Sequence, residues 1–371
     1  MRISKEALRG YLLEEALAYL IKNTGYTLLV DKSQDERELQ KRGNGLVVIG
    51  RGGEHQVDVL GQLSWIPTFT FPIRLFIEAK FRNAKTGIDV VRSAVGIIED
   101  LNQNFSPMRE TGILIKRYNY NYALFSTSGF SKDAIKMAIA HRISLIDLSG
   151  PEFTDLRNMI EQAANNIIQY YATREDVAVT NDNTVENEDD SLSRNSFITQ
   201  LRMFIRQQLR TLPVSVIENQ YWRGQDEGIL LDNFLGELIS FLNHYNELFV
   251  GMANGPFMLV LKADDVNDFR SYVEEYPTHK VTIHWSAYDH GGRRWYIRPV
   301  DYYNRRYQLT FTLPKILGDW IFKSNNPISK AINAKEKYLS NITIYRSSED
   351  KDELYRLIYS AEDTQRLINN F

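Results

Sequence analysis

The spacing of apolar side chains changes from helix-like to strand-like along the first 80 residues. Between residues 4 and 23, leucine, isoleucine and alanine recur every three or four positions, which predicts a helix that ends near Gly25. Three shorter stretches, 45–50, 55–63 and 73–81, are rich in β-branched residues and predict successive strands. Because these strands follow one another directly, we expect them to pair in antiparallel fashion.

The following residues alternate between helix and strand patterns. Helical spacing returns at 87–103, and residues 122–128 form a clear strand pattern. Ser131 has the position of an N-cap for a helix over 132–142, and a last short strand is predicted at 143–148. This order predicts an α/β fold in which helices flank a mixed sheet.

A change in composition divides the chain. After a predicted helix at 153–172, residues 174–195 are polar, acidic and poor in large apolar side chains, which indicates a disordered linker. Beyond it we expect helices at 196–211, 229–247 and 265–276, and strands at 256–263, 280–287, 294–300 and 306–313. The predicted organisation is a first domain over 1–173, the acidic linker, and an α+β domain over 196–371 for regulation, recognition or assembly.

Composition excludes several classes of protein. The chain of 371 residues has no cysteine, which excludes disulfides, thiolate zinc sites and cysteine nucleophiles. No apolar run approaches the roughly 18 residues of a membrane-spanning helix. The net charge of -3 hides a slightly basic first 160 residues and an acidic remainder. We therefore expect a cytoplasmic protein that binds no membrane.

The strand RLFIEAKF, residues 74–81, carries a pair of charges within an apolar sequence. Glu78 and Lys80 are two residues apart and point to one face of the strand, while Ile77 and Ala79 point to the other. Asp58 has the same setting between two valines in the preceding strand. If 55–63 and 73–81 pair as a hairpin, the two carboxylates converge on one face.

Two converging carboxylates beside a lysine suit one kind of chemistry. Hard cations such as Mg²⁺ take oxygen ligands, and a neighbouring lysine can orient a water or stabilise charge on a phosphate. The pattern therefore indicates metal-assisted hydrolysis of phosphodiesters. The alternative is an ion pair on a solvent-facing strand, which is the common reading of an isolated E-x-K tripeptide.

Four segments resemble the Mrr-type restriction endonucleases of the PD-(D/E)xK nuclease superfamily. They are GRGGEHQVDVLG, RLFIEAKF, GIDVVRSAVGIIED and LFSTSGFSKDAIKMAIAHRISLIDL, within residues 4–150. The resemblance implies a restriction-endonuclease-like αβββαβ core, a metal held by Asp58 and Glu78, and Lys80 as the last member of the catalytic motif. It also implies a metal-binding glutamate on the first helix, for which Glu14 is the candidate and Glu15 the alternative.

The expected function is a Mg²⁺-dependent endonuclease that hydrolyses DNA, with Mn²⁺ as a substitute metal. The resemblance implies a role in restriction or phage defence. The alternatives are a repair or recombination nuclease, such as a junction resolvase, and a DNA-binding module without catalysis. We expect the second domain to mediate assembly, either as a homo-oligomer or with a partner protein.

Four arginines are candidates for contact with nucleic acid. Arg92 follows the catalytic strand on the helix 87–103, and Arg294, Arg298 and Arg306 lie in the basic, aromatic stretch 290–308. Arginine contacts phosphates, and aromatic rings stack on bases. The alternatives are an ordinary surface arginine for Arg92 and, for the others, a hairpin whose arginines pair with acids of the same domain.

The GRGGEH segment, residues 50–55 with Gly50 at its start, allows two readings. Its glycines can cradle a phosphate through backbone amides, or they can only turn the chain. His55 can assist a water or a phosphate, or it can cap a turn.

Overall fold

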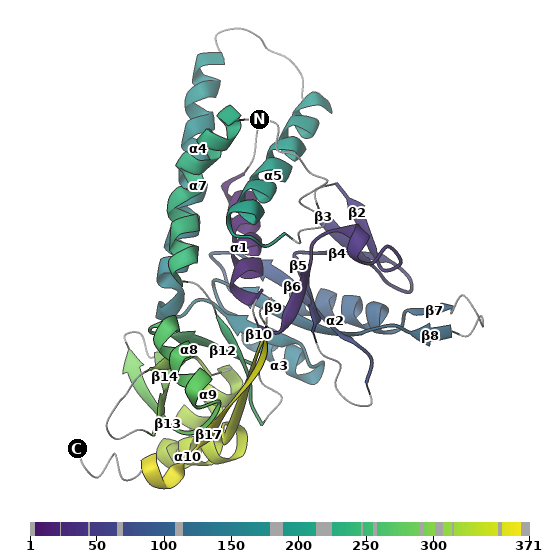
Figure 1. Cartoon of the computed structure of the whole chain (residues 1–371). Coiled ribbons are helices and arrows are strands. Elements are labelled where there is room, and N and C mark those ends of the chain that lie inside the picture. Colours follow the sequence, from purple (N-terminus) through teal and green to yellow (C-terminus); the bar gives the residue numbers. More distant parts are fainter. Residues whose placement is uncertain are drawn as a thin grey trace.

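A computed structural model gives the fold of the chain. It describes residues 4–22, 24–43, 45–64, 70–107, 114–178, 188–212, 225–245, 248–254, 258–288, 292–300, 307–313, 315–347 and 351–364. The fold is a mixture of helices with several sheets (Figure 1).

The largest open sheet has five strands in the order β1-β5-β6-β9-β10. Their bounds are Tyr26–Leu29, Val59–Leu63, Ile73–Lys80, Asn119–Ser126 and Ser144–Asp147. β1, β5 and β6 pair in antiparallel fashion, whereas β6, β9 and β10 are parallel. The parallel strands are connected through helices α2 (Ile88–Asn102) and α3 (Lys132–Ala140), as parallel pairing requires. The predicted mixed sheet is confirmed.

Helices cover both faces of this sheet. Ile77 and Ala79 belong to an apolar core with α1 (Lys5–Ile21), while Phe76 belongs to a second core with α2 and α3. The predicted N-cap of α3 is confirmed, since Oγ of Ser131 accepts a hydrogen bond from the Ala134 amide at 3.2 Å.

The predicted strand 55–63 is two strands, and this prediction was wrong in one respect. β4 (Glu54–Val57) pairs with β3 (Gly45–Ile49) in a separate sheet with β2 (Leu39–Arg42), while β5 pairs with β6. The chain leaves one sheet and enters the other at Asp58. An alternating pattern cannot show this change of sheet, because both halves keep the same period of two.

Three long helices pack around α1. They are α4 (Thr154–Ala178), α5 (Glu188–Gln208) and α7 (Gln225–Tyr245). Figure 1 shows α1 with α4 and α7 on one side and α5 on the other. α4 and α5 reach into the predicted linker 174–195, of which residues 179–187 lie outside the described part. One apolar core includes side chains from α1, α4, α5 and α7, so it continues across the predicted domain boundary.

The C-terminal part is a closed β-barrel in the order β11-β12-β15-β14-β13-β17-β16. The strands are β11 (Phe249–Met252), β12 (Met258–Ala263), β13 (Thr278–Tyr288), β14 (Gly292–Pro299), β15 (Leu309–Phe311), β16 (Asn341–Ser347) and β17 (Asp352–Tyr359). Helices α8 (Val266–Glu275), α9 (Lys315–Phe322) and α10 (Pro327–Tyr338) accompany them. The expected α+β character is present, whereas the closure and the strands β11, β16 and β17 were not predicted.

Smaller elements complete the described chain. These are the 3-10 helices η1 (Lys32–Gln34) and η2 (Pro151–Phe153), and the hairpin of β7 (Phe105–Pro107) and β8 (Leu114–Lys116). No helix of the described ranges is long and apolar enough to cross a membrane.

Candidate active site

Asp58 and Glu78 lie opposite each other at one end of the β5–β6 pair. The register joins Val59 to Ile77, so the next position outward faces Asp58 toward Glu78. Oδ2 of Asp58 accepts a hydrogen bond from the Ala79 amide at 2.8 Å. Because the backbone turns into β4 at this point, the carboxylate takes the place of the backbone acceptor that a continuing strand would provide. The expected pairing is present for residues 59–62 but not for 55–57, and the register places Asp58 opposite Glu78, as expected.

Glu78 has two further partners on its own face of the sheet. Nζ of Lys80 lies 2.5 Å from Oε1 of Glu78, and the Tyr122 hydroxyl donates to Oε2. Tyr122 comes from β9, where it lies beside Phe76 in the parallel register and stacks on its ring at 5.0 Å. Tyr122 was not foreseen, although tyrosine alternates with smaller residues in NYNYALFS.

The two glutamates of α1 are both buried, and each pairs with an arginine of α5. Arg202 binds Glu14 through an Nη2–Oε2 ion pair, and Arg206 donates two hydrogen bonds of 2.7 Å to Glu15. Neither arginine was singled out from the sequence. The signal was present as two arginines four residues apart among apolar positions, which places them on one helix face.

The negative charge of Asp58 acts on Glu14 of α1. Burial raises the pKa of Glu14 to about 8 although Arg202 acts in the opposite direction, and Asp58 adds to the increase. Burial also raises the pKa of Asp58 against the effects of the Ala79 amide and Lys80, with Glu78 adding to the rise. Asp58 thus lies close enough to Glu14 on one side and to Glu78 on the other for their negative charges to repel, and a cation beside Asp58 would stabilise the charged forms.

The carboxylates of the site are oxygen donors that suit a hard divalent cation, although they do not form a complete set of ligands. No group of three or more histidine, aspartate or glutamate side chains within the described ranges could hold a metal ion. Mg²⁺ commonly uses only one or two carboxylates together with waters and substrate phosphates. Asp58 and Glu78 supply such oxygen donors, and Oδ1 of Asp58 has no hydrogen-bond partner among the described residues.

The GRGGEH turn is held by Asp100 at the end of α2. Its carboxylate accepts hydrogen bonds from the Gly52 amide at 2.8 Å and the Gly53 amide at 3.2 Å, and it lies 2.7 Å from Nε2 of His55. Burial favours a higher pKa for Asp100, but these hydrogen bonds lower it overall. Since the amides and the imidazole already bind one carboxylate, the contacts support the turn reading over a phosphate cradle.

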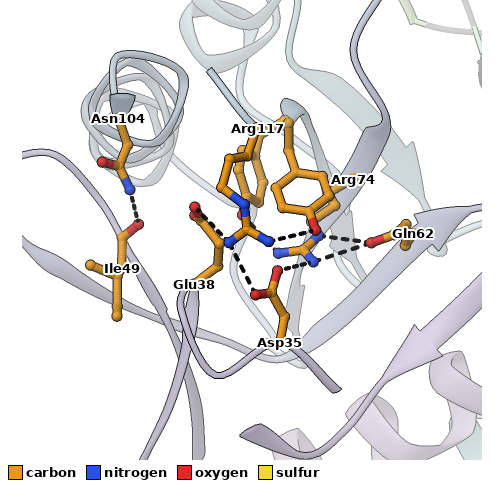
Figure 2. Close-up of polar contacts among 9 residues, drawn as sticks. Asp35, Glu38, Ile49, Gln62, Arg74, Asn104 and Arg117 are labelled. Atoms are coloured by element: carbon orange, nitrogen blue, oxygen red, sulfur yellow. Dashed lines mark hydrogen bonds and ion pairs between the residues drawn. The ribbon is translucent and has the colours of Figure 1, made fainter. Parts of the chain in front are cut away.

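A buried arginine in β6 was also missed. Arg74 precedes Glu78 by four residues and is only 1% exposed. Its guanidinium donates to Asp35 at 2.6 Å and to Gln62 at 3.1 and 3.2 Å, and lies 3.5 Å over the Tyr118 ring (Figure 2). Arg117 reaches the same Asp35 at 3.1 Å. This cluster ties the segment after η1 to β5, β6 and β9, and so supports the strand that carries Glu78.

The candidate DNA-binding arginines have partners within the chain. Arg92 is exposed and lies 3.0 Å from Asp89 on the same helix. Nε of Arg294 lies 3.9 Å from Oε2 of Glu152, and Arg298 donates to Gln308 at 2.7 Å. The Arg92 contact agrees with the alternative of a surface arginine. The contacts of Arg294 and Arg298 differ from the expected pairing with acids of the same domain, because Glu152 precedes the predicted linker and Gln308 is uncharged. Arg306 lies outside the described residues.

Comparison with known proteins adds no assignment. No protein-family model and no curated protein matches the chain. A solved structure with some likeness is the crystal structure of AF1548, a protein of unknown function. It shares 15% identity and a TM-score of 0.29, over 63% of this chain and 98% of that one. At this TM-score the likeness supports no conclusion about fold or function.

Proposed function

We propose that the chain is a metal-dependent endonuclease of the PD-(D/E)xK type that hydrolyses DNA phosphodiester bonds. The observation that carries the proposal is the meeting of Asp58, Glu78 and Lys80 at one end of the β5–β6 hairpin. The order of α1, the antiparallel β1, β5 and β6, then α2 and the parallel β9 supports an αβββαβ core. Restriction or phage defence is the setting that we propose for this activity.

Each residue has a task in this proposal. Asp58 and Glu78 would hold a Mg²⁺ ion, which when bound would polarise the phosphate and lower the pKa of a bound water. Tyr122 orients Glu78 through its hydroxyl, and the Ala79 amide orients Asp58. Lys80, placed beside Glu78, stabilises the negative charge that develops on the phosphate in the transition state.

The test is cleavage of supercoiled plasmid by the purified protein, with and without Mg²⁺. Asp58→Asn and Glu78→Gln keep the size of each side chain but remove its charge, so we expect each to lower the rate by about 100-fold or more. Asp89→Asn is the matched control, because Asp89 is an exposed acid of the same unit.

Lys80→Met separates chemistry from binding. We expect it to lower the single-turnover rate while DNA affinity stays within a few-fold of wild type, since Lys80 acts on the transition state. Mg²⁺-dependent cleavage at the wild-type rate by well-folded Asp58→Asn protein would overturn the proposed function. DNA binding without cleavage under all conditions would instead favour the non-catalytic DNA-binding alternative.

A further inference from the structure

Helix α5 lies against the acidic positions of α1 with two arginines. Arg202 contacts Glu14, and its Nη1 lies 3.7 Å from Oε1 of Glu15. Its guanidinium also lies 4.8 Å over the ring of Tyr11. The side chains of Arg202 and Glu14 are only 7% and 10% exposed. This is a buried, directed contact between helices far apart in the sequence.

The same helix also lines a cavity beside Asp58. This cavity of about 110 Å³ is lined by Asp58 and neighbouring strand residues. Thr199, Arg202, Met203 and Arg206 of α5 belong to the same lining. A cation or phosphate in this cavity would therefore lie next to residues of α5 as well as Asp58.

Arg202 and a divalent cation compete for the same carboxylate. A buried glutamate needs a positive partner, because an unpaired buried charge is strongly unfavourable. Arg202 supplies that charge to Glu14, and its guanidinium occupies an oxygen that a metal would require. Glu14 cannot serve both partners through this oxygen, so a metal that takes Oε2 of Glu14 displaces Arg202.

We propose that α5 is an autoinhibitory latch whose Arg202 keeps the metal site incomplete until the helix is released from α1. This inference rests on the proposed nuclease function and names its regulation. When Arg202 and Arg206 leave the glutamates they need new anions, and the phosphates of DNA are anions of that kind. In this exchange the two arginines would pair with phosphates of the DNA, and the glutamate would pair with the metal.

The first test measures metal affinity by titration calorimetry with Mn²⁺ alone. Arg202→Gln removes the competing charge, so we expect Mn²⁺ to bind about 5- to 150-fold more tightly than to wild type. Arg9→Gln is the matched control, since Arg9 is a buried arginine of α1 that pairs with Glu161. We expect this control to leave Mn²⁺ affinity unchanged. Unchanged or weaker Mn²⁺ binding by folded Arg202→Gln protein would overturn the latch.

The second test uses the wild-type chain and so does not depend on how the variant folds. With the protein saturated by Mn²⁺, amide hydrogen exchange across residues 198–208 of α5 should become faster, while α2 stays unchanged as an internal reference. Equal exchange in α5 with and without bound Mn²⁺ would contradict the release of the helix.

The two proposals fail in different ways. If Asp58→Asn abolishes cleavage, but Arg202→Gln leaves Mn²⁺ affinity unchanged and Mn²⁺ leaves α5 exchange in the wild type unchanged, the nuclease stands and the latch is wrong. If neither wild type nor Arg202→Gln binds Mn²⁺ or cuts DNA, the proposed function is wrong, and the latch with it.

Discussion

At the scale of single residues, the candidate site is a set of one buried and two half-buried acids that each have a specific partner. Asp58 accepts a hydrogen bond from a backbone amide, and Glu14 forms an ion pair with Arg202. Glu78 forms an ion pair with Lys80 and accepts a hydrogen bond from Tyr122. Asp58, Glu78 and Lys80 could be predicted, because charges in apolar strands break a visible pattern, whereas Glu14 on α1 was a candidate only through the family resemblance. Tyr122 and Arg202 could not, since their partners are set by the packing of β9 and α5.

Tyr122 provides a test of how Glu78 is positioned. Tyr122→Phe keeps the ring that stacks on Phe76 but removes the hydroxyl that donates to Glu78. We expect the rate of plasmid cleavage or the Mn²⁺ affinity to fall by about 10- to 100-fold, as for other groups that orient a metal ligand. Tyr276→Phe, at an exposed position of the C-terminal part, is the control. Unchanged metal affinity and rate in Tyr122→Phe would show that Glu78 does not depend on this hydrogen bond.

Lys335 of α10 makes the stability of the barrel depend on pH. Burial lowers the pKa of Lys335 from 10.5 to about 8, beside the rings of Trp295 and Tyr359. Below pH 8 the amine is charged in both the folded and the unfolded state, and the folded state bears the full desolvation cost. Between about pH 8 and 10.5 only the unfolded state keeps the proton, so stability rises with pH across this window.

Lys335→Met removes this dependence. We expect the variant to be more stable than wild type at pH 7, by at most about 3 kcal/mol, with the difference shrinking toward pH 10. Urea unfolding followed by tryptophan fluorescence at pH 7 and pH 9.5 measures it, and Lys337→Met is a control on the same helix. A difference between variant and wild type that stays constant with pH would contradict the assignment to Lys335.

At the scale of elements, most helices and strands of the first 150 residues follow from apolar spacing. The exceptions are β1, β2 and β7, which were not predicted, and the 55–63 stretch, which crosses between two sheets at Asp58. The spacing of apolar residues indicates which face of a strand a side chain lies on, but it does not indicate which other strand the strand pairs with. The closed barrel was missed for the same reason, because β11 pairs with β16 across about 90 residues of sequence.

The buried Arg74 cluster is expected to determine how firmly β6 is held. Arg74→Met leaves Asp35 without its closest cation, and breaking a buried ion pair typically costs about 3–5 kcal/mol of unfolding free energy. Chemical denaturation monitored by circular dichroism gives this value, and Arg37→Met, at an exposed position nearby, is the control. A loss below about 1 kcal/mol would show that Arg117 alone compensates Asp35.

At the scale of the whole molecule, the apolar core around α1 extends across the change in composition near residue 174. The buried side chains that α5 and α7 add to the core of α1 are Phe197, Leu201, Phe204, Ile205, Leu231, Leu235, Leu238, Ile239 and Leu242. Composition indicated a linker because polar residues dominate there, yet the helices after it return to α1. Sequence composition cannot show such a return, because it carries no information on tertiary contacts.

Truncation tests this continuity. A fragment of residues 1–173 lacks α5 and α7 and should expose apolar surface, so we expect stronger ANS fluorescence and a lower urea midpoint than for residues 1–245. The longer fragment retains all four helices that share the core. If the shorter fragment is as stable as the longer one, the helices after the linker are dispensable for the fold of the first domain.

The late position of α5 in the sequence has a consequence during protein synthesis. β10, the last strand of the open sheet, ends at Asp147, whereas α5 ends at Gln208. At ribosomal rates of roughly 5–20 residues per second, the intervening stretch of about 60 residues takes roughly 3 to 12 seconds to make. Throughout that interval the nascent chain already contains Glu14, Asp58, Glu78 and Lys80, but not the arginines that pair with the glutamates of α1. Every newly made copy of the protein therefore passes through a short period in which its acidic residues have been synthesised but the pairing arginines of α5 have not.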